Sequence, residues 1–176
     1  MNRRRLLIAG AGTYALVAYE IAVETGAFET IDFVDDQKTL APTGERIAGT
    51  TKEIRKLEKD YSDIIVALGN PEVRLSMLER IEKETGLTIC TLVSPRAYVA
   101  PSARMECGVI VEPMAVIHAS CQIGRGALIS AGAVINHESI CKDGVHVDCN
   151  ATVPGYQTVP AKTKVRCGTV YGMLPD

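Results

Sequence analysis

The feature that most constrains this chain is a six-residue repeat that keeps its phase from residue 99 to residue 170. The first residue of every six is aliphatic, methionine or, once, cysteine. These positions are Val99, Met105, Val111, Ile117, Ile123, Ile129, Ile135, Cys141, Val147, Val153, Val159 and Val165. An amphipathic helix repeats its apolar residues every 3.6 positions or so, which excludes a helix here. A six-residue period is typical of a parallel β-helix.

The repeat also predicts how the coils are built. Three sixes form one triangular coil, in which the apolar residues point inward and small fifth residues fit near the corners. Coils stack at about the spacing of paired strands, ~4.8 Å. The twelve sixes therefore predict about four coils, each of which needs a neighbour because it cannot cover its own apolar interior. A β-sandwich of short alternating strands is the alternative, and an unbroken phase over twelve units disfavours it.

The N-terminal segment has the pattern of a mononucleotide-binding unit. An apolar strand is predicted over 4–9, followed by the G-x-G-x-x-A turn of residues 10–15 and a helix that stops at Gly26. A second strand, 29–36, ends in Asp35-Asp36. This order is that of half a Rossmann-like fold, in which glycines let the backbone approach a phosphate and a helix N-terminus faces the anion.

The rest of this segment predicts further α/β structure. The expected elements are a loop over 37–51, a helix over 52–60 capped by Thr51, a strand over 63–68, a helix over 71–85 that carries Val73, Leu75, Leu78 and Ile81, and a strand over 88–93. Asn70 is the expected N-cap of the last helix, with Pro71 at its first position. Ser94-Pro95 then interrupts the chain. We therefore expect a Rossmann-like domain over residues 1–94, too small for a full dinucleotide, and a β-helix over 95–176.

Composition limits the function classes. The net charge of −2 leaves no basic footprint for nucleic acid. The sequence has no apolar run of membrane-spanning length and no signal peptide, so we expect a cytoplasmic protein without a membrane span. The six cysteines form no C-x-x-C pair and are interpreted as reduced thiols. Cys149 and Cys167 are 18 residues apart, which predicts packing on successive coils rather than a metal site.

All three histidines of the chain lie in the repeat: His118, His137 and His146. Glu138 follows His137, and a carboxylate beside a histidine can hold one imidazole nitrogen and leave the other as a base. His146 lies nine residues later, half a coil away, so one chain cannot easily bring both rings to one substrate atom. A site between the subunits of a trimer is therefore expected. The alternative is that each histidine is a turn residue bonded to the backbone.

Together these residues are similar to those of a known family. The glycine turn of residues 10–15, Asp35-Asp36, Gly69-Asn70, and coils with His137-Glu138 and then His146 resemble the sialic acid O-acetyltransferase and UDP-4-amino-sugar N-acetyltransferase family. The similarity covers nearly the whole chain. It implies a left-handed β-helix, a homotrimer, and acetyl-CoA as co-substrate in the groove between subunits. It also implies that the N-terminal domain holds the nucleotide sugar, of UDP-amino-sugar or sialic-acid type.

The resemblance also implies roles for single residues. His137 would be the general base, polarised by Glu138, and would remove a proton from a sugar amine or hydroxyl as it attacks the thioester. His146 would contact the acetyl donor, and the Gly155 amide would bind the thioester oxygen. The nucleotide sugar would be held by Gly12, Thr13, Tyr14, Asp35, Asp36, Gly69 and Asn70. No metal is expected.

Three other functions compete with the acetyltransferase. One is a sugar-nucleotide-binding regulatory protein with a shortened, inactive β-helix. A second is a γ-type carbonic anhydrase, also a left-handed β-helix with three histidines, but its zinc ligands include two histidines five apart, and this sequence has no such pair. A third, an NAD oxidoreductase, rests on Gly10-x-Gly12 alone.

Overall fold

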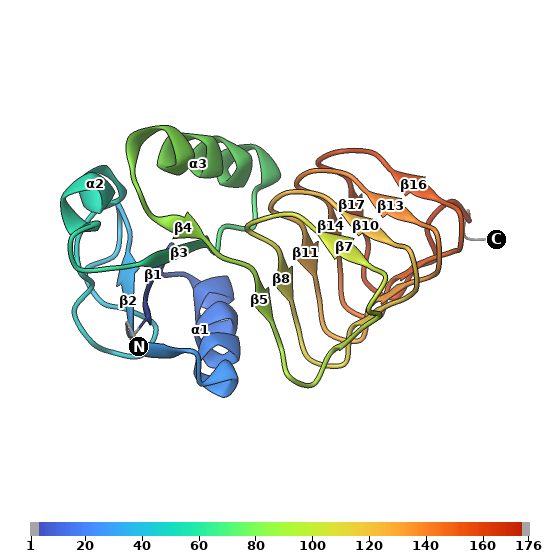
Figure 1. The fold of residues 1–176 in the computed structure, drawn as a ribbon, viewed down its shortest axis with the longest axis horizontal. Helices are drawn as coiled ribbons and strands as arrows, with labels where there is room; N and C mark the ends of the chain where they lie inside the picture. Colours follow the sequence, from blue (N-terminus) through green and yellow to red (C-terminus); the bar gives the residue numbers. More distant parts are fainter. Residues whose placement is uncertain (1–3, 174–176) are drawn as a thin grey trace. The chain divides into compact units, whose positions relative to one another are not determined.

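The structure is a computed structural model that describes residues 4–173, and the chain divides into two compact units, Met1–Leu92 and Val93–Asp176 (Figure 1). The division lies two residues before the boundary expected after residue 94. Residues 1–3 of the expected first domain and 174–176 of the second lie outside the described residues.

The first unit is built on a four-stranded parallel sheet with the strand order β2-β1-β3-β4. Its strands are β1 (Arg4–Ala9), β2 (Phe28–Val34), β3 (Asp63–Val66) and β4 (Thr88–Ile89). Its helical segments are α1 (Thr13–Thr25), η1 (Thr51–Glu53), α2 (Ile54–Leu57) and α3 (Pro71–Glu84). The chain leaves β1 toward β2 on one side and returns to β3 on the other. The strand order therefore reverses between β1 and β3, where parallel α/β sheets bind their ligands.

Continuous apolar runs in the two central strands explain the layers of this unit. Leu6–Ala9 in β1 and Ile64–Val66 in β3 are 0% exposed. Strands have such continuous apolar runs when helices cover both faces of a parallel sheet. Here α1 contacts β1 and β2, α3 contacts β3 and β4, and the two helices lie on opposite sides of the sheet (Figure 1).

The helix ends follow local sequence rules, with one correction. Gly26 ends α1 in the left-handed conformation, and the Asn70 side chain accepts a hydrogen bond from the Val73 N–H at 3.0 Å at the start of α3. The expected cap of the second helical segment was wrong. Thr50, not Thr51, forms a capping box with Glu53, and the Thr51 hydroxyl donates to Asp36 instead.

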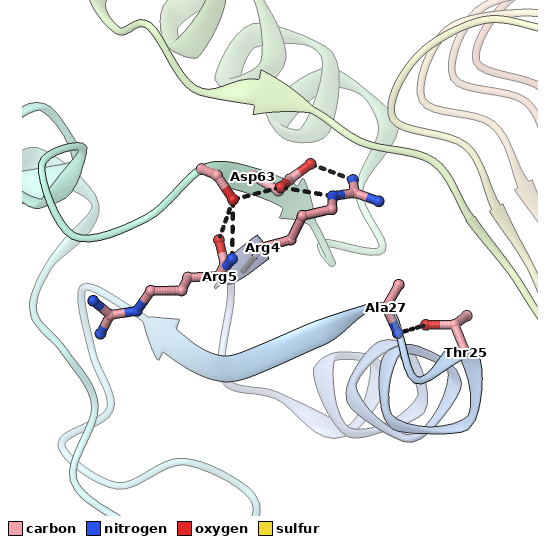
Figure 2. Close-up of polar contacts among 6 residues, drawn as sticks. Arg4, Arg5, Thr25, Ala27 and Asp63 are labelled. Atoms are coloured by element: carbon pink, nitrogen blue, oxygen red, sulfur yellow. Dashed lines mark hydrogen bonds and ion pairs between the residues drawn. The ribbon is translucent and has the colours of Figure 1, made fainter. Parts of the chain in front are cut away.

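At the amino ends of β1 and β3, an ion pair joins the two strands (Figure 2). The Arg4 guanidinium donates to both carboxylate oxygens of Asp63, with Nε 3.1 Å from Oδ2. Ser62 donates to the same carboxylate at 2.7 Å and accepts from the Arg5 N–H at 2.9 Å. Both oxygens of the buried Asp63 carboxylate therefore accept hydrogen bonds, which offset the cost of burying its charge. The glycine turn of residues 10–15 lies at the opposite end of these strands, their carboxyl edge.

The second unit is a parallel β-helix of three sheets. Its strands are β5 (Leu92–Val93), β6 (Tyr98–Val99), β7 (Arg104–Met105), β8 (Ile110–Val111), β9 (Val116–Ile117), β10 (Gln122–Ile123), β11 (Leu128–Ile129), β12 (Val134–Ile135), β13 (Ile140–Cys141), β14 (His146–Val147), β15 (Thr152–Val153), β16 (Thr158–Val159) and β17 (Lys164–Val165). The sheet orders are β16-β13-β10-β7, β17-β14-β11-β8-β5 and β15-β12-β9-β6. Paired residues are 18 apart, as in Ile129 with Val147, so three sixes make one coil as predicted.

The apolar first residues of the sixes fill the interior of this unit. From Val111 to Val165 they are between 0% and 4% exposed, while Val99 and Met105, in the first coil, are partly buried. The β-helix begins one strand earlier than expected. The predicted strand over 88–93 is two strands, β4 in the first unit's sheet and β5 in the β-helix. Val93 lies six residues before Val99, so the repeat extends back to this strand.

Asp35 fixes the loop that follows β2. Its Oδ2 accepts a hydrogen bond from the Ala11 N–H at 2.8 Å, and its Oδ1 accepts from the Gln37 and Lys38 N–H groups at 2.8 and 2.9 Å. Burial raises the pKa of this carboxyl, but the three backbone donors outweigh it and hold the pKa below its usual range. The charged form of Asp35 therefore stabilises the glycine turn after β1.

Replacement of Asp35 should make this contribution visible as a pH dependence. Asp35→Asn turns an amide N–H toward a backbone donor, and we expect a loss of about 1–2 kcal/mol in the free energy of unfolding near pH 7. Because the pKa of the folded state lies below the unfolded value of about 3.9, the contribution is present above that value and is lost as the pH falls through the folded pKa. Urea unfolding at about pH 7 and about pH 3 measures the difference.

Glu45→Gln is the control, because Glu45 is exposed in the loop after β2 and its replacement removes the same charge. It should leave the stability unchanged at both pH values. A difference between the wild type and Asp35→Asn that is as large in acid as at neutral pH would contradict this account.

Candidate functional site

The seven residues expected to hold a nucleotide sugar lie at the carboxyl edge of one sheet. Gly12, Thr13 and Tyr14 follow β1, Asp35 and Asp36 follow β2, and Gly69 and Asn70 follow β3. These are the strands around the point where the strand order reverses. The first unit thus brings the predicted residues together at the edge where parallel α/β sheets bind ligands.

The glycines of the turn after β1 serve two different purposes. Gly10 has φ +111°, and a Cβ there would lie 3.0 Å from the Ala67 carbonyl oxygen, so the fold itself requires this glycine. Gly12 has ordinary extended dihedral angles, and a Cβ there would meet nothing within 4 Å. The same is true of the space beside Gly69. Gly12 and Gly69 therefore border open space that no other part of the protein fills.

The start of α1 can receive an anion in that space. Gly12 is the N-cap of this 13-residue helix, and no side chain caps it. The first N–H groups of a helix have no partner within the helix and carry the positive end of its dipole. Thr13, the first residue of α1, is exposed. A phosphate beside Gly12 would therefore meet backbone donors directly.

Three of the polar side chains expected at this edge, those of Asp35, Asp36 and Asn70, have protein partners. Asp35 binds the backbone of its own loop and of the glycine turn, as described above. Asp36 accepts from the Thr51 N–H at 2.9 Å and from the Thr51 hydroxyl at 2.8 Å. Asn70 caps α3. These side chains shape the loops of the site, and their direct contact with a ligand stays a prediction.

Arg74 is a residue of this edge that the sequence did not reveal. Its side chain is fully buried on α3, in line with Leu78 and Ile81, whereas the neighbouring Val73 is 51% exposed. The guanidinium donates to the carbonyl oxygens of Leu68 at 2.7 Å and Gly69 at 2.9 Å. Burial lowers the pKa of this guanidinium, and nearby Tyr14 and Glu72 act in the opposite direction. Arg74 thus fixes the backbone of Leu68 and Gly69, which borders the open space beside Gly69.

In the second unit, His137 lies in the turn between β12 and β13 and is exposed. Its ring edge rests on the backbone of the next coil. A Cβ on Gly155 would lie 3.0 Å from Cε1 and 3.2 Å from Nε2 of His137. No side chain fits there without displacing the imidazole. The structure therefore places the predicted base directly beside the backbone of the predicted oxyanion donor.

Three further contacts hold the backbone and ring of His137. Its N–H donates to the Asn136 side-chain oxygen at 2.8 Å, and its carbonyl accepts from the Tyr156 N–H at 3.1 Å. The Tyr156 ring packs against the imidazole with centroids 5.0 Å apart and planes at 84°. Sequence reasoning missed Tyr156, although its position 18 residues after Glu138 places it at the same corner of the next coil.

The side chain of Glu138 faces a polar pocket and makes no hydrogen bond to the side chain of His137. It lines a polar pocket of about 590 Å³ with Ser102, Arg104, Ser120 and Gln122, among other residues. Within residues 4–173, no hydrogen bond joins the side chains of His137 and Glu138. That Glu138 polarises His137 therefore stays a prediction.

His146 is the first residue of β14, in the sheet β17-β14-β11-β8-β5, which contains neither β12 nor β13, the strands on either side of the His137 turn. Its Nε2 is 3.0 Å from the Ser130 Oγ and 3.8 Å from the Asp148 Oδ1, and Asp148 pairs with the Lys164 ammonium at 2.9 Å. Burial raises the pKa of Asp148, but Lys164, the Cys149 N–H and His146 together hold it below its usual range. Serine and aspartate address the same ring nitrogen, so this is not a Ser-His-Asp triad, in which they bind opposite nitrogens.

Neither a metal-binding cluster nor a membrane-spanning helix is found among the described residues. Residues 4–173 contain no group of three or more histidine, cysteine or carboxylate side chains placed to hold a metal ion. Over the same residues, no helix combines the length and the apolar character needed to cross a membrane.

Each unit of the chain contains a segment that matches a known protein family. Residues 5–81 match the PglD N-terminal domain. Residues 102–137 match the bacterial transferase hexapeptide family (six repeats). The first match spans the glycine turn, Asp35-Asp36 and Gly69-Asn70, and the second ends at His137.

Solved structures match nearly the whole chain. The acetyltransferase domain of PglB from Neisseria gonorrhoeae, in complex with acetyl coenzyme A, is 27% identical, with 96% of this chain and 85% of that chain covered and a TM-score of 0.83. A histidine-to-asparagine variant of perosamine N-acetyltransferase from Caulobacter crescentus, in complex with CoA and GDP-perosamine, is 26% identical, with 94% and 87% covered and a TM-score of 0.72.

These comparisons confirm the expected fold class, a Rossmann-like α/β domain followed by a left-handed parallel β-helix. They also confirm the family that the sequence resembles. Along nearly its whole length the chain is similar to hexapeptide-repeat acetyltransferases, and residues 5–81 form a PglD-type N-terminal domain.

Proposed function

We propose that this acyltransferase moves the acetyl group of acetyl-CoA to the amine or hydroxyl of a nucleotide-linked sugar. One observation carries the proposal: an exposed imidazole, His137, lies with its Nε2 edge against the backbone of Gly155. A base next to a backbone donor is the arrangement that acyl transfer needs. The similar PglB domain binds acetyl coenzyme A, which supports this donor.

The proposed reaction is a direct transfer. The substrate nitrogen or oxygen attacks the thioester carbonyl carbon while His137 takes its proton, and the carbonyl oxygen becomes an oxyanion. The Gly155 N–H donates to no protein acceptor among residues 4–173, so it can donate to this oxyanion, a type of contact worth about 3 kcal/mol in other enzymes. The intermediate then collapses, the C–S bond breaks, and the proton on His137 passes to the sulfur of the departing CoA.

The nucleotide part of the acceptor is assigned to the first unit. The open space beside Gly12 and Gly69 and the uncapped start of α1 suit a diphosphate. The similar perosamine N-acetyltransferase binds GDP-perosamine, a nucleotide-linked amino sugar. We therefore propose a nucleotide-linked amino sugar, of the UDP or GDP type, as the acceptor, with a sialic-acid-like sugar as the second choice.

We also infer a homotrimer that works in the cytoplasm. His137 lies in the turn between β12 and β13, whereas His146 starts β14 in another sheet, so one prism presents the two rings on different sides. A neighbouring copy can complete a groove in which one subunit supplies His137 and the next supplies His146. The six free cysteines support a reducing compartment.

Gly12→Ala tests the nucleotide site without disturbing the fold. A methyl group at Gly12 meets no protein atom and suits the local dihedral angles. The lower entropy of the unfolded chain offsets the weaker N-cap preference of alanine, so we expect a Tm close to that of the wild type. The methyl group takes up space that we assign to the phosphates. The rise in Tm on addition of UDP- or GDP-linked amino sugars, measured by thermal shift, should therefore shrink.

Gly86→Ala is the matched control, because a Cβ there also meets nothing within 4 Å and Gly86 lies after α3. It should change neither the Tm nor the ligand-induced shift. If Gly12→Ala keeps the full shift, the nucleotide does not approach this turn.

His137→Ala tests the base. We expect the rate of acetyl transfer, followed as acetylated product by chromatography, to fall by about 10²–10⁴-fold while the fold persists. His118→Ala is the control, since the His118 ring packs instead against Tyr98 with centroids 6.5 Å apart. It should retain a rate within about twofold of the wild type.

An unchanged rate in His137→Ala would remove His137 as the base. If the wild type binds nucleotide sugars but transfers no acetyl group to any of them, the chain is the regulatory protein considered above.

A further inference from the structure

The corners of the β-helix differ in which residues take the left-handed backbone conformation. From residue 108 to residue 168, such residues recur every 18 positions and form three columns. One column holds Gly108, Gly126, Gly144 and Lys162, the second holds Met114, Gly132, Asn150 and Gly168, and the third holds Ser120, Glu138 and Tyr156. Glycine and asparagine adopt this conformation most readily. Among the described residues, the third column contains neither.

The third column lies at the corner that carries His137. Ser120 and Glu138 line the polar pocket of that corner, and Tyr156 follows them one coil later. Tyr156 has φ +61° and is 74% exposed, so neither backbone preference nor burial in the core explains a tyrosine there. A side chain kept in a disfavoured backbone conformation at an exposed corner points to a role at the surface.

The contact made by Tyr156 identifies that role. Its ring meets the imidazole of His137 nearly at a right angle, which is a favoured geometry for an aromatic pair. The Gly155 backbone lies against the Cε1 and Nε2 edge of the same imidazole. Two consecutive residues of one turn therefore confine the ring, Gly155 by its lack of a side chain and Tyr156 by its aromatic face or edge.

We propose that Tyr156 is a positioning residue for acetyl transfer, which holds the His137 imidazole against Gly155 so that the base and the oxyanion donor face one carbonyl. This rests on the proposed function. The aromatic ring makes the contact, so Tyr156→Phe preserves it. Tyr156→Asn removes the ring but keeps a residue that tolerates the left-handed backbone, so the turn stays folded.

The contact can be measured without any substrate. The chain has three histidines, and its imidazole Cε1–H signals in a proton NMR spectrum are assigned with His118→Ala, His137→Ala and His146→Ala variants. The Tyr156 ring, 5.0 Å away, shifts the His137 signal by its ring current. We expect this shift to be lost in Tyr156→Asn and kept in Tyr156→Phe. Lys162→Asn, at an exposed left-handed position of another corner, is the control and should leave the signal unchanged.

The kinetic result separates positioning from simple support of the fold. In Tyr156→Asn we expect kcat to fall by about tenfold while the KM for acetyl-CoA stays within about twofold, because the ring is confined only for the chemical step. Tyr156→Phe and Lys162→Asn should keep kcat within about twofold of the wild type.

Each outcome decides the proposal. A His137 signal that does not move in Tyr156→Asn overturns it, whatever the activity, because the contact is then absent. A signal that moves while kcat stays unchanged also overturns it, because the contact then has no role in transfer. If the wild type transfers no acetyl group, the proposed function fails and the positioning role fails with it, and the NMR shift then reports only a structural contact.

Discussion

The stacking of apolar side chains 18 residues apart is the interaction on which the rest of the β-helix depends. Val111, Ile129, Val147 and Val165 lie one above another in successive coils, and the interior they form with the other two sheets excludes water almost completely. A coil without neighbours would expose this interior, so the register between coils is strongly determined. That register brings together corner residues that are also about 18 apart, and it places the His137 ring beside Gly155 and Tyr156. The geometry of the candidate site thus follows from the phase of the core.

The sequence predicts a feature well when a pattern along the chain determines it, and poorly when contacts made only in the folded chain determine it. The six-residue phase is a property of the whole repeat, so it predicts the coils. The role expected of Gly155 came only from the family resemblance, and its contact with His137 is seen only in the structure. The apolar run over 88–93 predicts one strand but forms two, because periodicity within six residues does not say to which sheet each half belongs. The burial of Arg74 could not be predicted, because the carbonyl oxygens that receive its charge lie in the loop after β3 and are brought near by the fold. The surroundings of Glu138 likewise depend on the direction of one side chain at a left-handed corner.

In the first unit, the same residue types serve the loops and the expected ligand. Aspartates after a strand and an asparagine before a helix are typical of nucleotide sites, and they are also good partners for backbone N–H groups. Here Asp35, Asp36 and Asn70 hold the turns in place, while Gly12 and Gly69 leave open space beside them. The sequence predicted where these residues gather but not which of them face the protein. The site that results offers mainly backbone donors, which suit a phosphate.

A crystal structure of the chain with acetyl-CoA tests the central claim most directly. The account predicts three copies around one axis, with CoA in the cleft between two of them. The thioester carbonyl oxygen should lie within hydrogen-bond distance of the Gly155 N–H and its carbon next to the His137 imidazole, with His146 of the neighbouring copy on the same CoA. CoA bound away from His137, or a chain that binds CoA as a monomer with His137 facing solvent alone, would contradict it.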